Sequence, residues 1–292
     1  MTTARVLAQA KVNLLLHVLA REASGYHSIE TVLLRLDLAD DIRVRVTNGR
    51  SLDCAGSVIP PSGLGTVEKN LAYRAAVAYS EAVGWPNGFA IEIDKRIPVG
   101  AGLGGGSADA GGVLRALDAM SPTPLGSRLI DLATPLGADV PFMTIESPMA
   151  LGWGRGERLF PIPALQPRDV IIVVPNFSIS TPDAYAWVSA DRGSYSPAAR
   201  LIPPESLATW EEVVVVASND FEAPVARRHP QIGEIVDELD SMDALVAMLS
   251  GSGSTVFGVF GAPADAAAIT RSTGFSTIST RTSDRVFRVE TD

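Results

Sequence analysis

The residues with the clearest chemical potential form a glycine-rich stretch in the first half of the chain. Residues 98–112 read PVGAGLGGGSADAGG, and five glycines between positions 100 and 106 stand directly before a run of helical spacing. Glycine lets successive backbone N–H groups turn toward one point, and a helix start adds partial positive charge. The stretch therefore indicates a loop that binds a phosphate group ahead of a helix.

Two common nucleotide-binding loops fit this stretch poorly. Gly100, Gly102 and Gly105 satisfy the GxGxxG pattern of dinucleotide folds, but the acidic residue expected about twenty residues later at a strand end is missing. Asp118 falls inside the predicted helix instead. A Walker A loop is excluded because no Lys-Ser or Lys-Thr pair follows the glycines. A glycine turn that packs tightly against a neighbouring helix remains the structural alternative.

A second set of polar residues lies on a predicted strand over residues 8–18, where apolar residues alternate at period two. Lys11, Asn13 and His17 share its other face between apolar residues, as in the wall of a binding site. An ordinary solvated lysine is the alternative for Lys11. Asp139 comes shortly before Pro141, a position typical of a helix cap, so its chemical role rests on further evidence.

The elements that must position these residues follow from hydrophobic periodicity. The opening third is predicted to be mostly antiparallel β-structure, with a turn at 22–27. A helix begins after Asn70 and ends at Gly84, and residues 89–93 form another strand. The glycine-rich stretch then leads into the next helix.

The second half mixes strands and helices in the same way. Strands are predicted at 171–175, 256–260 and 286–290, and helices at 231–239 and 263–270. Residues 244–249 fit either type, and residues 189–206 are expected to form an irregular surface excursion. A domain boundary is expected near 150–165, so the fold class is α+β.

Composition excludes several classes of protein. The 292 residues carry a net charge of -9 and a sequence pI near 4.9, which argues against a broad nucleic-acid or anionic membrane surface. Cys54 is the single cysteine, so an intramolecular disulfide is impossible and a cytoplasmic setting is expected. The amino-terminal residues lack the apolar core of a signal peptide. Residues 244–264 lack charge, but SGSGS in their middle favours two strands around a loop over a membrane span.

The glycine stretch resembles the phosphate-binding signature of the GHMP kinase superfamily, the small-molecule kinases of galactose, homoserine, mevalonate and related substrates. AKVNLLLHV at 10–18 and SGSGSTVFGVF at 250–260 resemble two further motifs of that superfamily. The resemblance implies two α+β domains with the active site in the cleft between them. Residues 1–157 would form the ATP-binding domain and residues 158–292 the domain on the substrate side.

Four further strings narrow the resemblance to one branch of the superfamily: GYHSIET at 25–31, GADVPF at 137–142, STPDAY at 180–185 and NDFE at 219–222. That branch phosphorylates the 2-hydroxyl of a methylerythritol that carries a cytidine diphosphate group, in non-mevalonate isoprenoid synthesis. Another GHMP kinase of the homoserine or mevalonate type is the alternative, as is a non-catalytic nucleotide-binding regulator.

The resemblance also implies residue roles. Asp139 would accept the proton of the reacting hydroxyl, and Lys11 would keep that carboxylate ionised and stabilise the transferred phosphoryl group. His17 has no matching role and is expected to be structural. The residues expected to contact the acceptor substrate are Asn13, Tyr26, His27, Thr181 and Tyr185.

For ATP, the resemblance implies the glycine stretch and two outlying side chains. The expected contacts are Asn70, Lys95, Gly100, Ala101, Gly102, Leu103, Gly104, Gly105, Gly106 and Ser107. Mg²⁺ is expected with ATP, its protein ligands are unassigned, and Ser107 is a candidate. The chain departs from the usual family pattern at Ala108, Gly111, Gly112 and Ser254. No nucleic acid or membrane partner is expected, and the protein is expected to be a monomer or weak homodimer.

Overall fold

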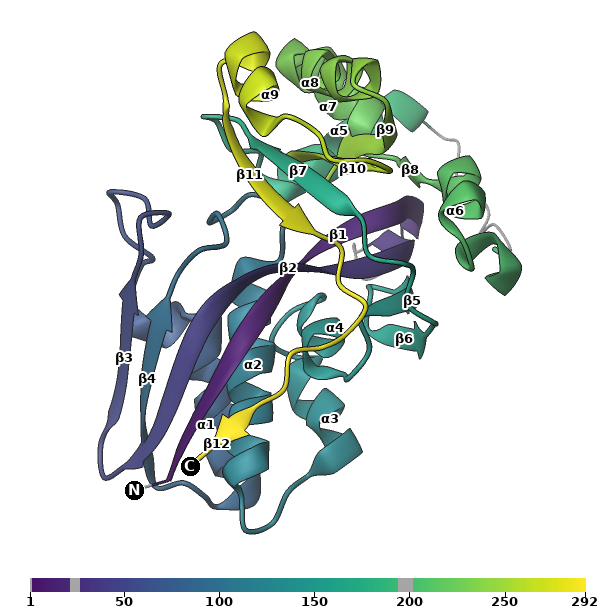
Figure 1. The fold of residues 1–292 in the computed structure, drawn as a ribbon. Helices are drawn as coiled ribbons and strands as arrows, with labels where there is room; N and C mark the ends of the chain where they lie inside the picture. The colour runs from purple at the N-terminus through teal and green to yellow at the C-terminus, as the bar shows by residue number, and fades with distance from the viewer. Residues whose placement is uncertain (1, 22–26, 194–201) are drawn as a thin grey trace.

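The computed structural model describes residues 2–21, 27–193 and 202–292 and contains two β-sheets (Figure 1). The larger sheet has the order β12-β1-β2-β4-β3, with β5, β6 and β8 joined to it. Its strands are β1 (Thr3–Arg21), β2 (His27–Thr47), β3 (Arg50–Ala55), β4 (Gly88–Asp94), β5 (Met149–Gly154), β6 (Arg158–Pro161), β8 (Ser218–Asn219) and β12 (Glu290–Thr291). The smaller sheet has the order β11-β7-β10-β9. Its strands are β7 (Asp169–Val174), β9 (Ala244–Leu249), β10 (Val256–Phe260) and β11 (Ser276–Arg281).

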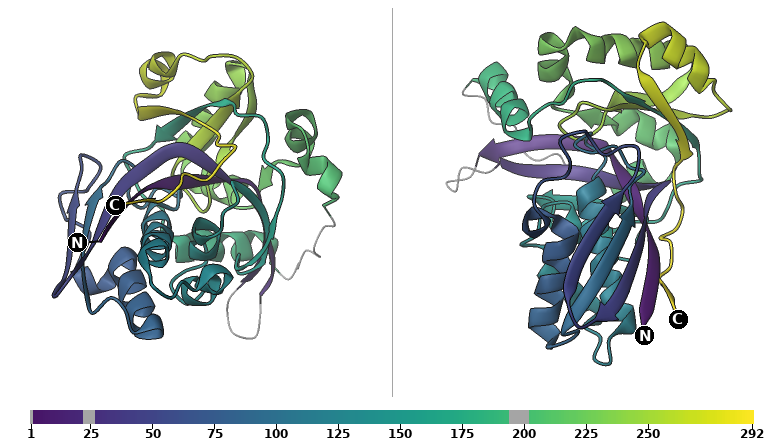
Figure 2. Two further views of the ribbon diagram at one scale, coloured as in Figure 1. Left: turned by 60° about the horizontal axis from the view of Figure 1, so that its bottom comes forward. Right: turned by 90° about the vertical axis from the view of Figure 1, so that its left-hand side faces the viewer.

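The helices divide between the two sheets (Figures 1 and 2). Four helices accompany the larger sheet: α1 (Leu71–Val83), α2 (Gly105–Met120), α3 (Leu129–Ala133) and α4 (Val140–Thr144). The later helices are α5 (Thr181–Arg192), α6 (Trp210–Val216), α7 (Glu222–Arg228), α8 (Pro230–Ser241) and α9 (Ala266–Thr273). This arrangement confirms the α+β class. Within the described residues, no helix is long and apolar enough to cross a lipid bilayer.

The two central strands of the smaller sheet, β7 and β10, are buried on both faces, which explains their nearly uninterrupted apolar sequences. On β7, Val170 and Ile172 join the core that also fills the larger sheet and its helices. Ile171 and Val173 point the other way, into a core shared with α5, α7, α8 and α9. Because side chains alternate along a strand, one strand thus contributes to two cores and ties the two sheets together.

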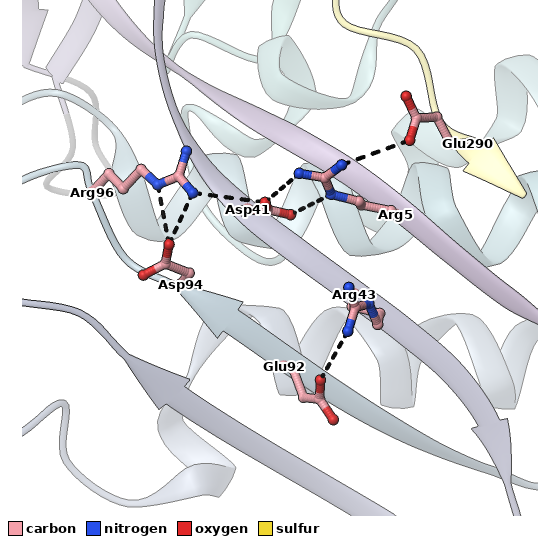
Figure 3. Close-up of polar contacts among 7 residues, drawn as sticks. All are labelled: Arg5, Asp41, Arg43, Glu92, Asp94, Arg96 and Glu290. Atoms are coloured by element: carbon pink, nitrogen blue, oxygen red, sulfur yellow. Dashed lines mark hydrogen bonds and ion pairs between the residues drawn. The ribbon is translucent and has the colours of Figure 1, made fainter.

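Part of the larger sheet presents a charged face to solvent (Figure 3). Arg5 on β1 pairs with Asp41 on β2 at 2.6 Å and with Glu290 on β12 at 3.9 Å. Arg43 pairs with Glu92 across β2 and β4. The Arg5 guanidinium holds the pKa of Asp41 below its ordinary value. Exposed pairs of this kind contribute little each to stability, so this face is a solvated surface.

The predicted elements agree with most of the structure, and the clearest disagreement is at the carboxyl end. The strand expected at 286–290 is wrong, because only Glu290 belongs to β12. The backbone of residues 285–287 forms hydrogen bonds with side chains instead of with a strand. Arg285 O accepts from Gln9 Nε2, Phe287 N donates to Gln9 Oε1, and Phe287 O accepts from Arg115. Strand β11 was not predicted, because its STISTR sequence lacks a strong apolar alternation.

Two other predicted segments are revised or remain untested. Residues 189–192, expected to be irregular, complete α5, and the part of that excursion from 194 to 201 lies outside the described residues. The turn expected at 22–27 also falls mainly outside them. The boundary after residue 157 stays a prediction; β6 and β12, which follow it in the chain, pair with strands of the larger sheet.

Candidate active site

The glycine-rich stretch forms an irregular loop that ends in the first turn of α2. Gly100, Gly102 and Gly104 have φ angles of 71°, 79° and 71°, the left-handed region that side chains disfavour. Gly104 is the N-cap of α2 and has no side chain to occupy the first N–H groups of the helix. Those groups, together with the helix dipole, make the start of α2 suitable for an anionic phosphate.

A second glycine loop, residues 250–254 between β9 and β10, packs directly on the first. The Ser250 hydroxyl donates to Gly102 O at 3.0 Å. A Cβ on Gly102 would lie 2.3 Å from Ser250 O, so only glycine permits this approach. Gly102 and Ser250, which are 148 residues apart in sequence, thus bring the two glycine loops together backbone to backbone.

Lys11 lies between these loops and faces Asp139. Lys11 Nζ is 3.4 Å from Asp139 Oδ2, with 5% of the lysine side chain and 34% of the aspartate side chain exposed. Asp139 precedes α4, all of whose residues the structure describes, and its side chain does not cap this helix. The carboxylate is therefore held by the lysine charge and remains accessible to a ligand, as a proton acceptor requires.

A buried hydrogen-bond network orients Lys11. Its ammonium donates to Asn13 Oδ1 at 2.8 Å, Asn13 Nδ2 donates to Thr31 Oγ1 at 2.8 Å, and Thr31 donates to Leu15 O. Because Asn13 is buried and engaged in this network, its position supports the lysine. His17 is elsewhere on β1, with Nε2 2.9 Å from Ser218 Oγ and Nδ1 3.5 Å from Glu30.

The two outlying side chains expected at ATP have partners within the protein. Lys95 is buried and pairs with Asp40 and with Asp109, the latter at 2.7 Å. Asn70 caps α1 by accepting from Ala72 N at 2.9 Å. Both lie beside the start of α2: a Cβ on Gly105 would be 3.5 Å from Lys95 Nζ, and one on Gly106 would be 3.8 Å from Leu71. Their contact with ATP stays a prediction.

Two aromatic rings from opposite halves of the chain stack on each other. The rings of His27 and Tyr185 lie 5.1 Å apart with an interplanar angle of 17°. Phe221 packs edge-on against Tyr185 at 4.8 Å. Burial, with a contribution from the Asp139 charge, raises the pKa of Tyr185 to about 12, so the phenol stays neutral.

The remaining residues predicted for the acceptor, and Ser107, predicted for ATP, lie in different places. Thr181, at the start of α5, has its hydroxyl 2.9 Å from that of Ser252 in the second glycine loop. Tyr26 lies outside the described residues. Ser107 is in the first turn of α2 and is partly exposed. The structure thus brings Lys11, Asp139 and the two loops together, and Thr181 joins them through Ser252.

The departures from the family pattern have a packing explanation. Ala108 is buried, with 2% exposure, and its N–H donates to Gly104 O in the helix. A Cβ on Gly111 would lie 2.7 Å from the backbone of Met143, so glycine allows α2 to approach α4 closely. A Cβ on Gly112 would be 3.2 Å from Ala8. The Ser254 hydroxyl donates to Phe177 O.

Comparison with known proteins defines the class. The protein-family model described as "GHMP kinases N terminal domain" matches residues 70–146. A second family model, described as "GHMP kinases C terminal", matches residues 206–272. A crystal structure of homoserine kinase from Cytophaga hutchinsonii has the same fold, with a TM-score of 0.66 at 14% identity, and covers 99% of this chain and 97% of its own. The chain belongs to the GHMP kinases and is a small-molecule kinase with ATP as co-substrate.

Within that class, two similar proteins are named for one activity. A 4-diphosphocytidyl-2-C-methyl-D-erythritol kinase of Syntrophotalea carbinolica is 40% identical over 289 residues, which is 97% of this chain and 97% of the relative. A crystal structure of 4-(cytidine 5'-diphospho)-2C-methyl-D-erythritol kinase is 35% identical, with a TM-score of 0.78, and covers 95% of this chain and 98% of its own. The resemblance found in the sequence is therefore confirmed.

Proposed function

We propose that this protein transfers the terminal phosphoryl group of ATP to the 2-hydroxyl of 4-diphosphocytidyl-2-C-methyl-D-erythritol, giving the 2-phosphate and ADP. The 40% identity over nearly the full length of the Syntrophotalea carbinolica relative supports this acceptor. The observation that carries the chemistry is the contact between Lys11 and Asp139 beside the glycine loops. The step belongs to non-mevalonate isoprenoid synthesis, and we propose a cytoplasmic location.

The proposed chemistry follows from charge and access. The oxygen of the acceptor hydroxyl attacks phosphorus, and Asp139 takes the proton of that hydroxyl. The Lys11 ammonium stabilises the charge that develops on the phosphoryl group. The first glycine loop and the start of α2 hold the phosphates of ATP through backbone N–H groups. Phosphoryl transfer needs mainly positioning and charge neutralisation, so these groups suffice on the protein side.

The site also fits a magnesium ion that arrives with ATP. Among the residues that the structure describes, no group of three His, Cys, Asp or Glu side chains could hold a metal ion. Mg²⁺ commonly binds through substrate phosphates, waters and one or two carboxylates. The partly exposed hydroxyl of Ser107 suits such an ion. When bound, it neutralises phosphate charge.

The aromatic pair supports a cytidine-bearing acceptor over a simple hydroxy acid or amino acid. Stacked His27 and Tyr185 rings offer a flat face and a polar edge to a pyrimidine, and Thr181 offers a hydroxyl nearby. We assign the acceptor to these residues, with Tyr26, and ATP to the loop, Asn70 and Lys95. We also propose the division at residue 157 and a monomer or weak homodimer.

The experiment that tests this function is ADP release by the purified protein with Mg²⁺ and ATP. The acceptors, assayed in parallel, are the cytidine diphosphate methylerythritol, homoserine, mevalonate and none. Turnover with the first acceptor alone is the expected result. Turnover with another acceptor would mean that the proposed substrate is wrong. If no acceptor gives ADP release and the protein still binds ATP, a nucleotide-binding regulator is favoured.

A further inference from the structure

We propose that Asn219 is a positioning residue for phosphoryl transfer, because its side-chain amide holds the second glycine loop against Lys11 and Gly102. The inference rests on the proposed function, in which that loop borders the reacting groups. Asn219 belongs to the string NDFE at 219–222, to which neither the chemistry of transfer nor the recognition of the acceptor gives a role.

The amide of Asn219 is fully engaged. Asn219 is 8% exposed, and its Nδ2 donates to both Leu249 O and Gly251 O at 2.8 Å. Its Oδ1 accepts from Phe221 N at 3.0 Å. The two carbonyls flank Ser250, the residue that bonds to Gly102. One amide therefore holds the loop on both sides of its contact with the first glycine loop.

We call the two hydrogen bonds from Asn219 Nδ2 to Leu249 O and Gly251 O the clamp. The clamp is anchored to β1, the strand that carries Lys11. Asn219 lies in β8, which pairs in parallel with β1 so that Asn219 is opposite Leu16. The NDFE string adds a second hold, because the Glu222 carboxylate accepts from Leu249 N at 2.8 Å. Both backbone groups of Leu249 are thus bound by side chains of this string. The loop is tied to β1 through side chains rather than through its own strand pairing.

Displacement of the loop would be felt at the reacting groups. A Cβ on Gly251 would lie 3.5 Å from Lys11 Nζ and 3.7 Å from Asn13 Oδ1, so the loop backbone forms one wall around the ammonium. Asn13 and Asp139 occupy the other contacts of Lys11. Since a shift of about 1 Å in reacting groups can cost about 100-fold in rate, a loosened loop affects turnover more than ATP affinity.

The testing substitution is Asn219→Asp, which preserves size and keeps the acceptor for Phe221 N. It replaces the donor group with an oxygen that faces two carbonyls. We expect kcat to fall about 10- to 100-fold while the KM for ATP stays within about threefold of the unsubstituted value. The ratio of variant to unsubstituted kcat should rise toward mildly acidic pH, because protonation of the introduced carboxylate restores one donor.

Asp265→Ala is the matched control. Asp265 caps α9 through Ala267 N and pairs with Arg271, and neither partner belongs to a glycine loop, so its removal lowers thermal stability without touching the clamp. Amide hydrogen exchange over residues 249–256 is measured in all three proteins. Faster exchange and lower kcat in Asn219→Asp alone would support the proposal.

Other results would overturn it. If amide exchange in the second glycine loop is unchanged in Asn219→Asp, then Asn219 does not hold the loop. If exchange is faster but kcat equals that of Asp265→Ala, the role of Asn219 is structural only. If the unsubstituted protein does not turn over the cytidine diphosphate acceptor, the proposed function fails separately. The exchange measurement then still decides whether Asn219 holds the loop, and the kcat ratio is taken with whichever acceptor is active.

Discussion

Lys11 and Asp139 meet from opposite ends of the first half of the chain, and their Nζ and Oδ2 atoms lie 3.4 Å apart. The lysine is buried and the aspartate is a third exposed, so the cation stays behind while the carboxylate faces outward. The pair therefore combines an accessible proton acceptor with a fixed positive charge beside the phosphate loop.

The first prediction concerns this pair. Asp139→Asn keeps the shape of the side chain and removes its basicity, so kcat should fall about 100- to 10,000-fold. ATP should bind with near-normal affinity, because the glycine loop is untouched. ADP release measures the first effect and calorimetric titration with ATP the second. Turnover equal to that of the unsubstituted protein would remove Asp139 from its role as base.

Stacking by Tyr185 should act on the acceptor and leave ATP alone. Tyr185→Leu loses the contacts with His27 and Phe221, and we expect the KM for the acceptor to rise about 3- to 10-fold. Tyr185→Phe keeps the ring and should stay near the unsubstituted value. Steady-state kinetics with each substrate varied in turn separates the KM for the acceptor from the KM for ATP. An equal rise in KM for ATP would contradict the assignment.

The buried carboxylate of Glu222 predicts a pH dependence of stability. Burial raises the pKa of Glu222 above its ordinary value of 4.5, so the folded protein binds this proton more tightly than the unfolded chain. Stability then decreases as pH rises through the window above 4.5. Glu222→Gln retains an acceptor for Leu249 N and should be more stable than the unsubstituted protein at neutral pH, with the difference shrinking on acidification.

Denaturant unfolding at several pH values measures this difference. The same substitution at Glu234, an exposed position on α8, provides the control and should leave the profile unchanged. A Glu222→Gln variant that loses stability at neutral pH would mean that the carboxylate charge itself holds Leu249.

Local signals made much of the fold predictable. The helix from Asn70 to Gly84 has both its cap and its stop in the sequence, and both occur: Asn70 accepts from Ala72 N, and Gly84 adopts a φ of 72°. Residues 286–290 alternate like a strand, yet their backbone bonds to the side chains of Gln9 and Arg115. Periodicity reports a local preference and carries no information on such distant partners.

The site was predictable only in part, for the same reason. A phosphate loop could be inferred from glycine spacing alone, whereas the sequence around Asp139 favours a helix cap, and only the family resemblance reverses that preference. The role of Asn219 was not inferred, because its partners Leu249 and Gly251 lie 30 and 32 residues away and contribute only backbone atoms. Lys95 likewise gave no sign of its two buried carboxylate partners.

Close packing at Gly111 predicts a cost for any side chain there. Gly111→Ala would place a Cβ 2.7 Å from the Met143 backbone, and separating α2 from α4 should lower the free energy of unfolding by about 1–3 kcal/mol. Gly233→Ala on α8 is the matched control, since its Cβ would meet only Ala226 at 3.8 Å. That variant should gain about 0.5–1 kcal/mol from the greater helix propensity of alanine. Denaturant unfolding compares the two.

The last prediction decides what Lys95 does. Its ammonium is the counter-charge for the buried carboxylates of Asp40 and Asp109. Burial raises the pKa of Asp109 while Lys95 opposes that rise, and Asp109 Oδ1 has no hydrogen-bond partner among the described residues. Lys95→Met leaves two buried carboxylates uncompensated, so the free energy of unfolding should fall by about 3–5 kcal/mol near neutral pH. The loss should shrink on acidification, because protonation relieves the repulsion.

A second substitution separates this effect from a direct contact with ATP. Adding Asp109→Asn to Lys95→Met removes one of the two uncompensated charges and should recover part of the lost stability. Urea unfolding of both variants measures the recovery, and ATP titration is carried out on the more stable one. If Lys95 acts mainly through ATP, the single variant keeps its stability and loses ATP affinity. If it acts through Asp40 and Asp109, stability is lost first, and the double variant binds ATP nearly as well as the unsubstituted protein.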